Sequence, residues 1–326
     1  MMNKKTITVL AALVSASSVV SAADSEWAVD VSVTPWLASW EQVSTSADRF
    51  GTDAIVVNYD IEDSIAYGFE LSLSYAGYSL SLESVQQSES DSGSDDKLSQ
   101  TKFAFLASEI VEGVSVDFQM MQGSFEGFIN GADNNGNTGT GTFETDLNLQ
   151  DVSVLFYKGL GIGVRSVDYD VPQDLYLVNN SAPNTSLLSG FEEISYSGVF
   201  VQLVAMSEDR YNTGYKAKSG LSYVFRYGVG ELDPSGAFLE ATEATLVSSS
   251  SIAANENIMQ ADSSSFVEAD LSYYMHQKWF DSDVKMRFGY RYTQWEASFT
   301  SNSDYALVTD FETSFSGPYV AVVGAF

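Results

Sequence analysis

The residues that could do chemistry in this chain are mostly carboxylates and a few cations. The sequence holds one histidine, His276, and no cysteine. Nucleophilic and general-base sites usually draw on histidine or cysteine, and thiolate metal sites need cysteine. No phosphate-binding, dinucleotide-binding or zinc pattern occurs. The residue types therefore predict no cofactor and offer little material for catalysis.

One group of oxygen-bearing side chains has a spacing that suits a metal ion. Asp133, Asn135, Asn137 and Glu144 occupy positions 1, 3, 5 and 12 of a calcium-loop pattern, in which carboxylate and amide oxygens coordinate the ion. Thr138 stands where that loop needs glycine for its sharp turn. The expectation is therefore that the chain binds no metal, with these four residues as the one candidate set.

The other charged residues recur every second position in segments whose intervening residues are apolar. This period is typical of strands with one wet and one apolar face. Acidic residues dominate the wet faces in the first half of the chain and basic residues in the second half. The residues expected on wet, inward faces are Asp30, Glu70, Glu83, Lys102, Asp117, Asp146, Arg165, Lys216, Lys218, Arg226, Glu268, Asp270, Lys285, Arg287 and Arg291.

Twelve segments with this period are needed to position these charges. They span residues 26–36, 66–75, 78–83, 102–107, 114–120, 143–157, 160–171, 191–206, 215–227, 267–275, 284–293 and 311–326, with a possible bulge near Arg165. Long polar connections follow the odd segments and short turns follow the even ones. Both chain ends then lie beside the short turns. Trp27 and Trp36, nine residues apart, have the spacing of two aromatic girdles.

The hairpin around residues 278–282 predicts one specific ionic cluster. If the turn is centred between His276 and Asp283, Glu268 lies opposite Arg291. Asp270 then lies diagonal to both neighbouring arginines of the facing strand.

The amino terminus predicts export. Lys4 and Lys5 precede an apolar run over residues 7–20 and the small-residue site Val20-Ser21-Ala22, which is the layout of a cleaved secretory signal. Residues 1–22 are therefore expected to be removed, leaving residues 23–326 as one domain. Cleavage reduces the 15 basic residues to 13 against 44 acidic ones. Such an acidic chain lacks the basic footprint that nucleic acid requires.

The carboxy-terminal stretch FETSFSGPYVAVVGAF, residues 311–326, alternates and ends on Phe326. It resembles the assembly signal of Gram-negative outer-membrane β-barrels, in which the last strand pairs with the first and leaves no open edge in lipid. The resemblance implies an all-β fold: a single closed antiparallel up-and-down transmembrane barrel with short periplasmic turns and long extracellular loops. It also implies contact with outer-membrane lipid, lipopolysaccharide and the barrel-assembly machinery. A soluble sandwich gives no reason for the alternation of long and short connections.

An acidic wall facing a basic wall resembles the transverse field of general diffusion porins. The sequence thus predicts a narrow passive channel for small hydrophilic solutes or ions, with acidic mouths that favour cations. The alternative is a closed, non-conducting barrel whose acidic loops bind a partner or cations, or serve the envelope. His276 would lie in the periplasmic aromatic girdle, away from a surface substrate, so no enzyme is expected. The oligomeric state stays open.

Overall fold

The computed structural model describes residues 27–47, 55–75, 77–87, 97–133, 138–156, 159–170, 176–177, 185–186, 193–205, 220–236, 240, 244, 259–279, 282–301 and 307–325. The predicted signal segment, residues 1–22, lies outside this part of the chain. Within it, no helix is long and apolar enough to cross a membrane.

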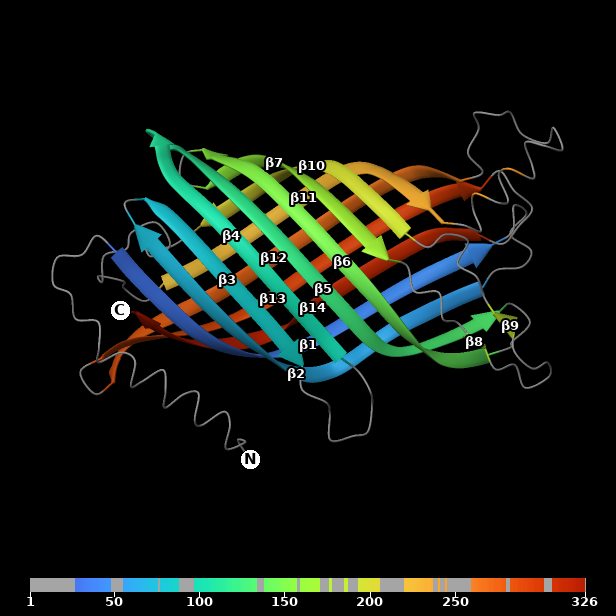
Figure 1. The fold of residues 1–326 in the computed structure, drawn as a ribbon, viewed down its shortest axis with the longest axis horizontal. Coiled ribbons are helices and arrows are strands. Elements are labelled where there is room, and N and C mark those ends of the chain that lie inside the picture. The colour runs from blue at the N-terminus through green and yellow to red at the C-terminus, as the bar shows by residue number, and fades with distance from the viewer. Residues whose placement is uncertain are drawn as a thin grey trace.

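Twelve long strands form one closed antiparallel barrel (Figure 1). They are β1 (Trp27–Ala47), β2 (Ile55–Tyr75), β3 (Tyr78–Gln87), β4 (Lys97–Val111), β5 (Val114–Asp133), β6 (Thr138–Phe156), β7 (Leu160–Asp170), β10 (Glu193–Ala205), β11 (Gly220–Ser235), β12 (Met259–Trp279), β13 (Ser282–Ser301) and β14 (Leu307–Ala325). A separate two-stranded ladder joins β8 (Tyr176–Leu177) and β9 (Thr185–Ser186). β1 pairs with β2 on one side and β14 on the other, with Val33 opposite Val322. The predicted closure of the last strand on the first is confirmed.

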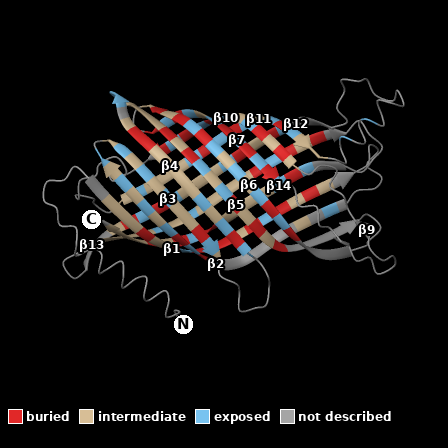
Figure 2. Cartoon of the chain, in the orientation of Figure 1, coloured by how far each residue is buried: buried red, intermediate tan, exposed pale blue. Residues whose placement is uncertain are grey.

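Each strand alternates between a lipid-facing and an interior residue (Figure 2). On β2 the apolar side chains from Ile65 to Tyr75 are exposed at every second position, and Ala66 between them is fully buried. Ten residue steps at about 3.3 Å each, tilted by about 40°, span roughly 25 Å, which is the height of the apolar band of a transmembrane barrel. The fold class predicted from the sequence is therefore confirmed.

The strands extend well beyond the apolar band on the side away from the termini, which corrects the predicted loops. Much of the expected polar loop 39–63 belongs to β1 and β2, and much of 123–142 belongs to β5 and β6. The alternation inverts above the band, because water lies outside and side chains fill the inside. On β1, Trp36 and Trp40 are buried in the interior, 2% and 3% exposed, while Glu41 faces out. Trp36 is therefore an interior residue and not part of a girdle.

The barrel narrows toward its long-loop end. β2 leaves β3 after the Ala66–Gln87 pair and then pairs directly with β5, from Asp60–Phe128 to Ile55–Asp133. β3 and β4 stop below this junction and do not take part in the wall there. The narrower barrel beyond the junction has little free space inside once its inward side chains are in place.

Aromatic and other apolar side chains pack inside the barrel in two clusters. The first contains Val167, Tyr169, Ile194, Tyr196, Phe200, Leu232, Phe266, Trp295, Ala297, Phe299 and Phe311. The second contains Trp36, Ala38, Trp40, Ala66, Val85, Leu98, Phe125, Phe143 and Tyr319. The Phe266 ring lies so close to the β11 backbone that Gly228 must be glycine. A Cβ there would lie 2.1 Å from a carbon of that ring. These clusters form a packed core inside the barrel.

Candidate functional site in the barrel lumen

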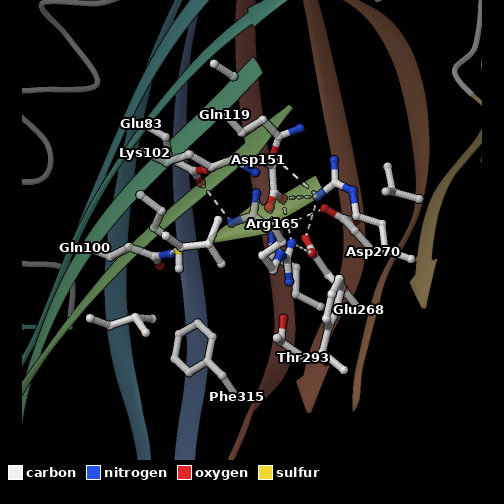
Figure 3. A pocket seen from close by; sticks show the side chains of 18 of the residues that line it. Glu83, Gln100, Lys102, Gln119, Asp151, Arg165, Glu268, Asp270, Thr293 and Phe315 are labelled. Carbon is white, nitrogen blue, oxygen red and sulfur yellow. Dashed lines mark hydrogen bonds and ion pairs between the residues drawn. The ribbon is translucent and has the colours of Figure 1, made fainter. Parts of the chain in front are cut away.

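The lumen holds a cavity of about 280 Å³ whose lining changes along the barrel. Ser74 and Ser79 line it near the short turns, and Trp40 and Thr313 line it toward the long-loop end. Between these levels lies a ring of charged side chains, here called the ionic belt (Figure 3). The belt comprises Glu83, Lys102, Asp117, Asp151, Arg165, Arg226, Glu268, Asp270, Arg287 and Arg291.

Arg165 on β7 forms the most buried ion pair of the described belt. Its Nε and Nη2 donate to the two carboxylate oxygens of Asp151 at 2.7 and 2.6 Å, and Nη2 also donates to Glu268 at 2.7 Å. Its guanidinium carbon lies 3.9 Å from the centre of the Phe266 ring. A planar guanidinium group suits both bidentate bonding to a carboxylate and stacking on an aromatic ring, and together these contacts fix Arg165 in position.

Arg226 on β11 reaches across the lumen toward β5. Its Nε donates to Gln202 at 3.0 Å and Nη1 donates to Glu268 at 3.0 Å. Nη2 lies 3.6 Å from the Asp117 carboxylate, which also accepts a 2.7 Å hydrogen bond from Gln119. Because β5 and β11 are not neighbours in the barrel, the contact between Arg226 and Asp117 crosses the interior.

Arg291 on β13 makes a second crossing. Its Nη1 donates to Glu83 on β3 at 2.9 Å, and Nε donates to Asp270 at 3.3 Å. Asp270 also accepts hydrogen bonds from Arg287 at 3.3 Å and from the Tyr319 hydroxyl at 2.7 Å. The guanidinium group of Arg291 thus joins two walls of the barrel.

The register of the β12–β13 hairpin differs from the predicted one by two residues. Glu268 lies opposite Thr293, and Asp270 lies directly opposite Arg291. The two strands stay paired as far as Trp279 and Ser282, so the turn is tighter than the sequence suggested. The predicted pairing of Glu268 with Arg291 is therefore wrong, and Asp270 is the cross-strand partner of Arg291 instead.

Most of the residues expected to face inward do so. Asp30, Glu70, Glu83, Lys102, Asp117, Arg165, Arg226, Glu268, Asp270 and Arg291 line the cavity, and Arg287 bonds to Asp270 beside them. Lys285 shares the face of β13 that carries Arg287 and Arg291. Lys216 and Lys218 lie outside the described residues. Opposite charges of the two halves pair directly instead of facing each other across an open bore.

Two expectations on β6 and β7 need correction. Asp146 is exposed on the outer face of β6, because Thr145 and Asp151 take the inward positions. β7 pairs with β6 in unbroken register from Leu160 to Tyr169, so there is no bulge near Arg165. Sequence reasoning missed Asp151, although pairing outward from the short turn at Lys158 places it opposite Arg165. Because β6 also carries polar residues on its outer face, the sequence did not show which of its alternate residues face inward.

The candidate calcium loop does not form as a loop. Thr138 and Glu144 lie on β6, whose extended backbone separates them by roughly 20 Å at about 3.3 Å per residue. Asn135 and Asn137 lie outside the described residues, and of Asp133 only its position at the end of β5 is described. Over the described chain, no cluster of three or more His, Cys, Asp or Glu residues suits a metal ion. The His276 backbone lies on β12 opposite Lys285 at the short-turn end; its side chain is outside the described part.

A further bridge crosses the lumen above the ionic belt. The Tyr169 hydroxyl on β7 donates to the Gln42 side-chain oxygen on β1, and these two strands lie on opposite sides of the ring. Gln42 is fully buried and Tyr169 is 2% exposed. From the short turns outward, the lumen therefore has three sections. The first is rich in serine and acidic residues, the second is the ionic belt, and the third is the layer of buried aromatic residues around Tyr169, here called the aromatic layer.

Comparison with solved structures returns barrels of similar extent and low similarity. A FadL homologue from Pseudomonas aeruginosa is 9% identical, with 91% of this chain and 90% of that chain covered and a TM-score of 0.32. The outer-membrane protease OmpT from Escherichia coli is 7% identical, with 92% and 96% covered and a TM-score of 0.31. The beta domain of the Bordetella autotransporter BrkA is 8% identical, with 87% and 98% covered and a TM-score of 0.31.

No protein-family model and no curated protein matches the sequence. The assignment of class therefore rests on the chain itself: twelve strands closed without a free edge, an outward apolar band of bilayer height, and an interior holding its charges. The chain is a transmembrane β-barrel of the outer-membrane type.

Proposed function

We propose that this barrel is a narrow passive channel for ions and small hydrophilic solutes. The observation that carries the proposal is that one cavity has a lining that continues past the ionic belt, from Ser74 and Ser79 to Thr313. A volume of about 280 Å³ spread over that length suits ions and molecules of a few heavy atoms and is too small for larger solutes.

The charge of the lining supports a preference for cations. Seven carboxylates line the cavity, from Asp30 to Asp270, against the four cations Lys102, Arg165, Arg226 and Arg291. A narrow passage with low-dielectric walls concentrates ions of the sign opposite to its own net charge. The excess of three negative charges therefore favours cations.

Recording from the refolded full chain in a planar bilayer tests the channel. Small, discrete current steps are expected, and in a salt gradient the reversal potential should favour cations. Glu70→Gln should lower that preference, because Glu70 lines the section of the cavity near the short turns. Glu41→Gln is the matched control, since Glu41 faces outward from β1. Anion preference in the unmodified chain would refute the cation preference.

A closed barrel is the second candidate, and a specific observation favours it. Tyr169 and Gln42 join opposite walls, and the aromatic residues around them are almost fully buried. A barrel packed in this way would serve envelope structure or present its acidic loop-end surface to a partner. The absence of current at any voltage, from protein shown to be folded, would establish this candidate and end the channel proposal.

The carboxy-terminal strand supports a further partner. β14 pairs with β1 and completes the ring, so no unpaired strand edge faces lipid at this seam. We infer that the barrel-assembly machinery recognises this strand. Neither passive passage nor a closed barrel involves a chemical step, so we propose no enzymatic activity.

A further inference from the structure

Glu83 has two cationic side chains within its range on different walls of the barrel. In the structure its carboxylate accepts a hydrogen bond from Arg291 on β13 at 2.9 Å. Its direct cross-strand neighbour is a different cation, Lys102 on β4. Cross-strand neighbours on one face of an antiparallel pair stand about 5 Å apart at Cβ, close enough for an ion pair. The carboxylate thus bonds to the far wall although a cation stands beside it.

Because Glu83 bonds to Arg291, Lys102 is left without this carboxylate as a partner. Its ammonium group experiences the charges of Glu268 and Glu83, yet among the described residues it forms no ion pair within 4.0 Å. Glu268 is already held by Arg165 and Arg226. The carboxylate free to exchange partners is therefore that of Glu83.

Arg291 can release Glu83 without becoming unpaired. Asp270 stands directly opposite it and accepts from its Nε at 3.3 Å. Its guanidinium carbon also lies 4.9 Å from the ring centre of Tyr319 and 5.4 Å from that of Trp36. These contacts hold the arginine on its own wall. Breaking the crossing leaves Arg291 with Asp270 and gives Glu83 to Lys102.

We propose that the Glu83 side chain acts as a latch that alternates between two ion-paired positions. In the first it bridges the lumen to Arg291 and narrows the passage at the ionic belt. In the second it pairs with Lys102 along its own wall and leaves the passage wider. In the first position Lys102 has no ion pair within the described chain and is held only by the more distant charges of Glu268 and Glu83, and in the second Arg291 keeps Asp270. Each position therefore leaves Glu83 with one cationic partner, and exchange between the two is possible. The side chains have room to move, since Glu83 and Arg291 are 13% and 23% exposed.

The latch supplies a gate for the proposed channel and in that sense rests on the proposed function, but its test needs no current. The chain has no cysteine, so one introduced cysteine reports access by its rate of reaction with a small thiosulfonate reagent. Thr293→Cys places the reporter on the cavity wall two residues beyond Arg291, toward the aromatic layer. Ser81→Cys places a control reporter on the wall two residues from Glu83, on the short-turn side.

Two substitutions bias the latch in opposite directions. Arg291→Gln removes the far partner, so Glu83 turns to Lys102, and labelling at Thr293→Cys should accelerate several-fold. Lys102→Met removes the near partner, so the crossing persists and labelling should slow several-fold. The rate at Ser81→Cys should stay unchanged in both. Arg291→Gln leaves Asp270 its bonds to Arg287 and Tyr319, which keeps the variant foldable; gel migration of unheated protein checks this.

Two controls separate the latch from a general change in charge. Lys97→Met removes a lysine from the same strand, but Lys97 pairs with Glu126 on the outer surface at 2.6 Å, so labelling should not change. In a Glu83→Gln background, Lys102→Met should have no effect, because the shared carboxylate is gone.

The outcomes distinguish the two proposals. Equal labelling of Thr293→Cys in all variants, or acceleration by both Arg291→Gln and Lys102→Met, would overturn the latch even if the chain conducts. Opposite shifts in labelling with no current in any variant would establish the latch and refute the channel.

Discussion

Arg165 is fixed by partners that come from two other strands, β6 and β12. Asp151 is its cross-strand neighbour, Glu268 lies 103 residues away on β12, and the Phe266 ring covers its guanidinium group. Both side chains of the Arg165–Asp151 pair are 4% exposed. At this depth the cost of removing one partner is set by the charge left behind.

Arg165→Met should therefore destabilise the barrel by about 3 to 5 kcal/mol, because Asp151 loses its bidentate partner in a buried site. The free energy of unfolding in urea, measured in detergent micelles, gives this value. The double variant Arg165→Met/Asp151→Leu should recover much of the loss, since no buried charge remains unpaired. A double variant less stable than Arg165→Met would contradict this account. The exposed Lys97–Glu126 pair is the control, and Lys97→Met should cost no more than about 1 kcal/mol.

The turns at the short-loop end depend on backbone conformation more than on contacts. Between β4 and β5 the chain reverses through Glu112 and Gly113, and Gly113 has φ of 74°. A Cβ added there would meet nothing within 4 Å. The conformation alone thus restricts this position, because side-chain-bearing residues disfavour positive φ.

Gly113→Ala should lower the free energy of unfolding by about 1 kcal/mol through this conformational cost. Gly113→Asn should lower it less, because asparagine adopts positive φ more readily. Urea unfolding of the three proteins decides the matter. Equal stability of the alanine and glycine forms would show that the turn tolerates another conformation.

The strands themselves were recognisable only where lipid lies outside. Over 66–75 and 267–275 the apolar residues face out and the polar ones face in, which is the alternation expected of a strand in a membrane barrel. Above the band the neighbouring strands β1 and β13 carry Trp40 and Trp295 inside and Glu41 and Glu296 outside. The period persists while its phase reverses, so the segment resembles a polar loop.

At the scale of the whole molecule, the outward apolar band determines which surface positions accept charge. Leu71 lies near the middle of the exposed apolar residues of β2. Leu71→Arg should destabilise the folded barrel in lipid by about 2 to 4 kcal/mol, the cost of arginine near the bilayer midplane. Asn148→Arg is the control, because its neighbours Gln122 and Asp168 are polar and exposed, and its effect should stay within about 1 kcal/mol. Equal costs for both, measured by unfolding from lipid vesicles, would show that the band is placed wrongly.

The sequence by itself determined the barrel: twelve segments of period two and a last strand that had to pair with the first, since lipid leaves no backbone edge unsatisfied. It also identified most of the inward charges, because parity along a strand is a local property. Only the tertiary structure decided which charges meet. Glu83 with Arg291 and Arg226 with Asp117 are contacts across the lumen, set by the curvature and register of the closed ring. Neither quantity is encoded in the period of any one strand, and therefore the aromatic layer and the latch lay beyond the sequence alone.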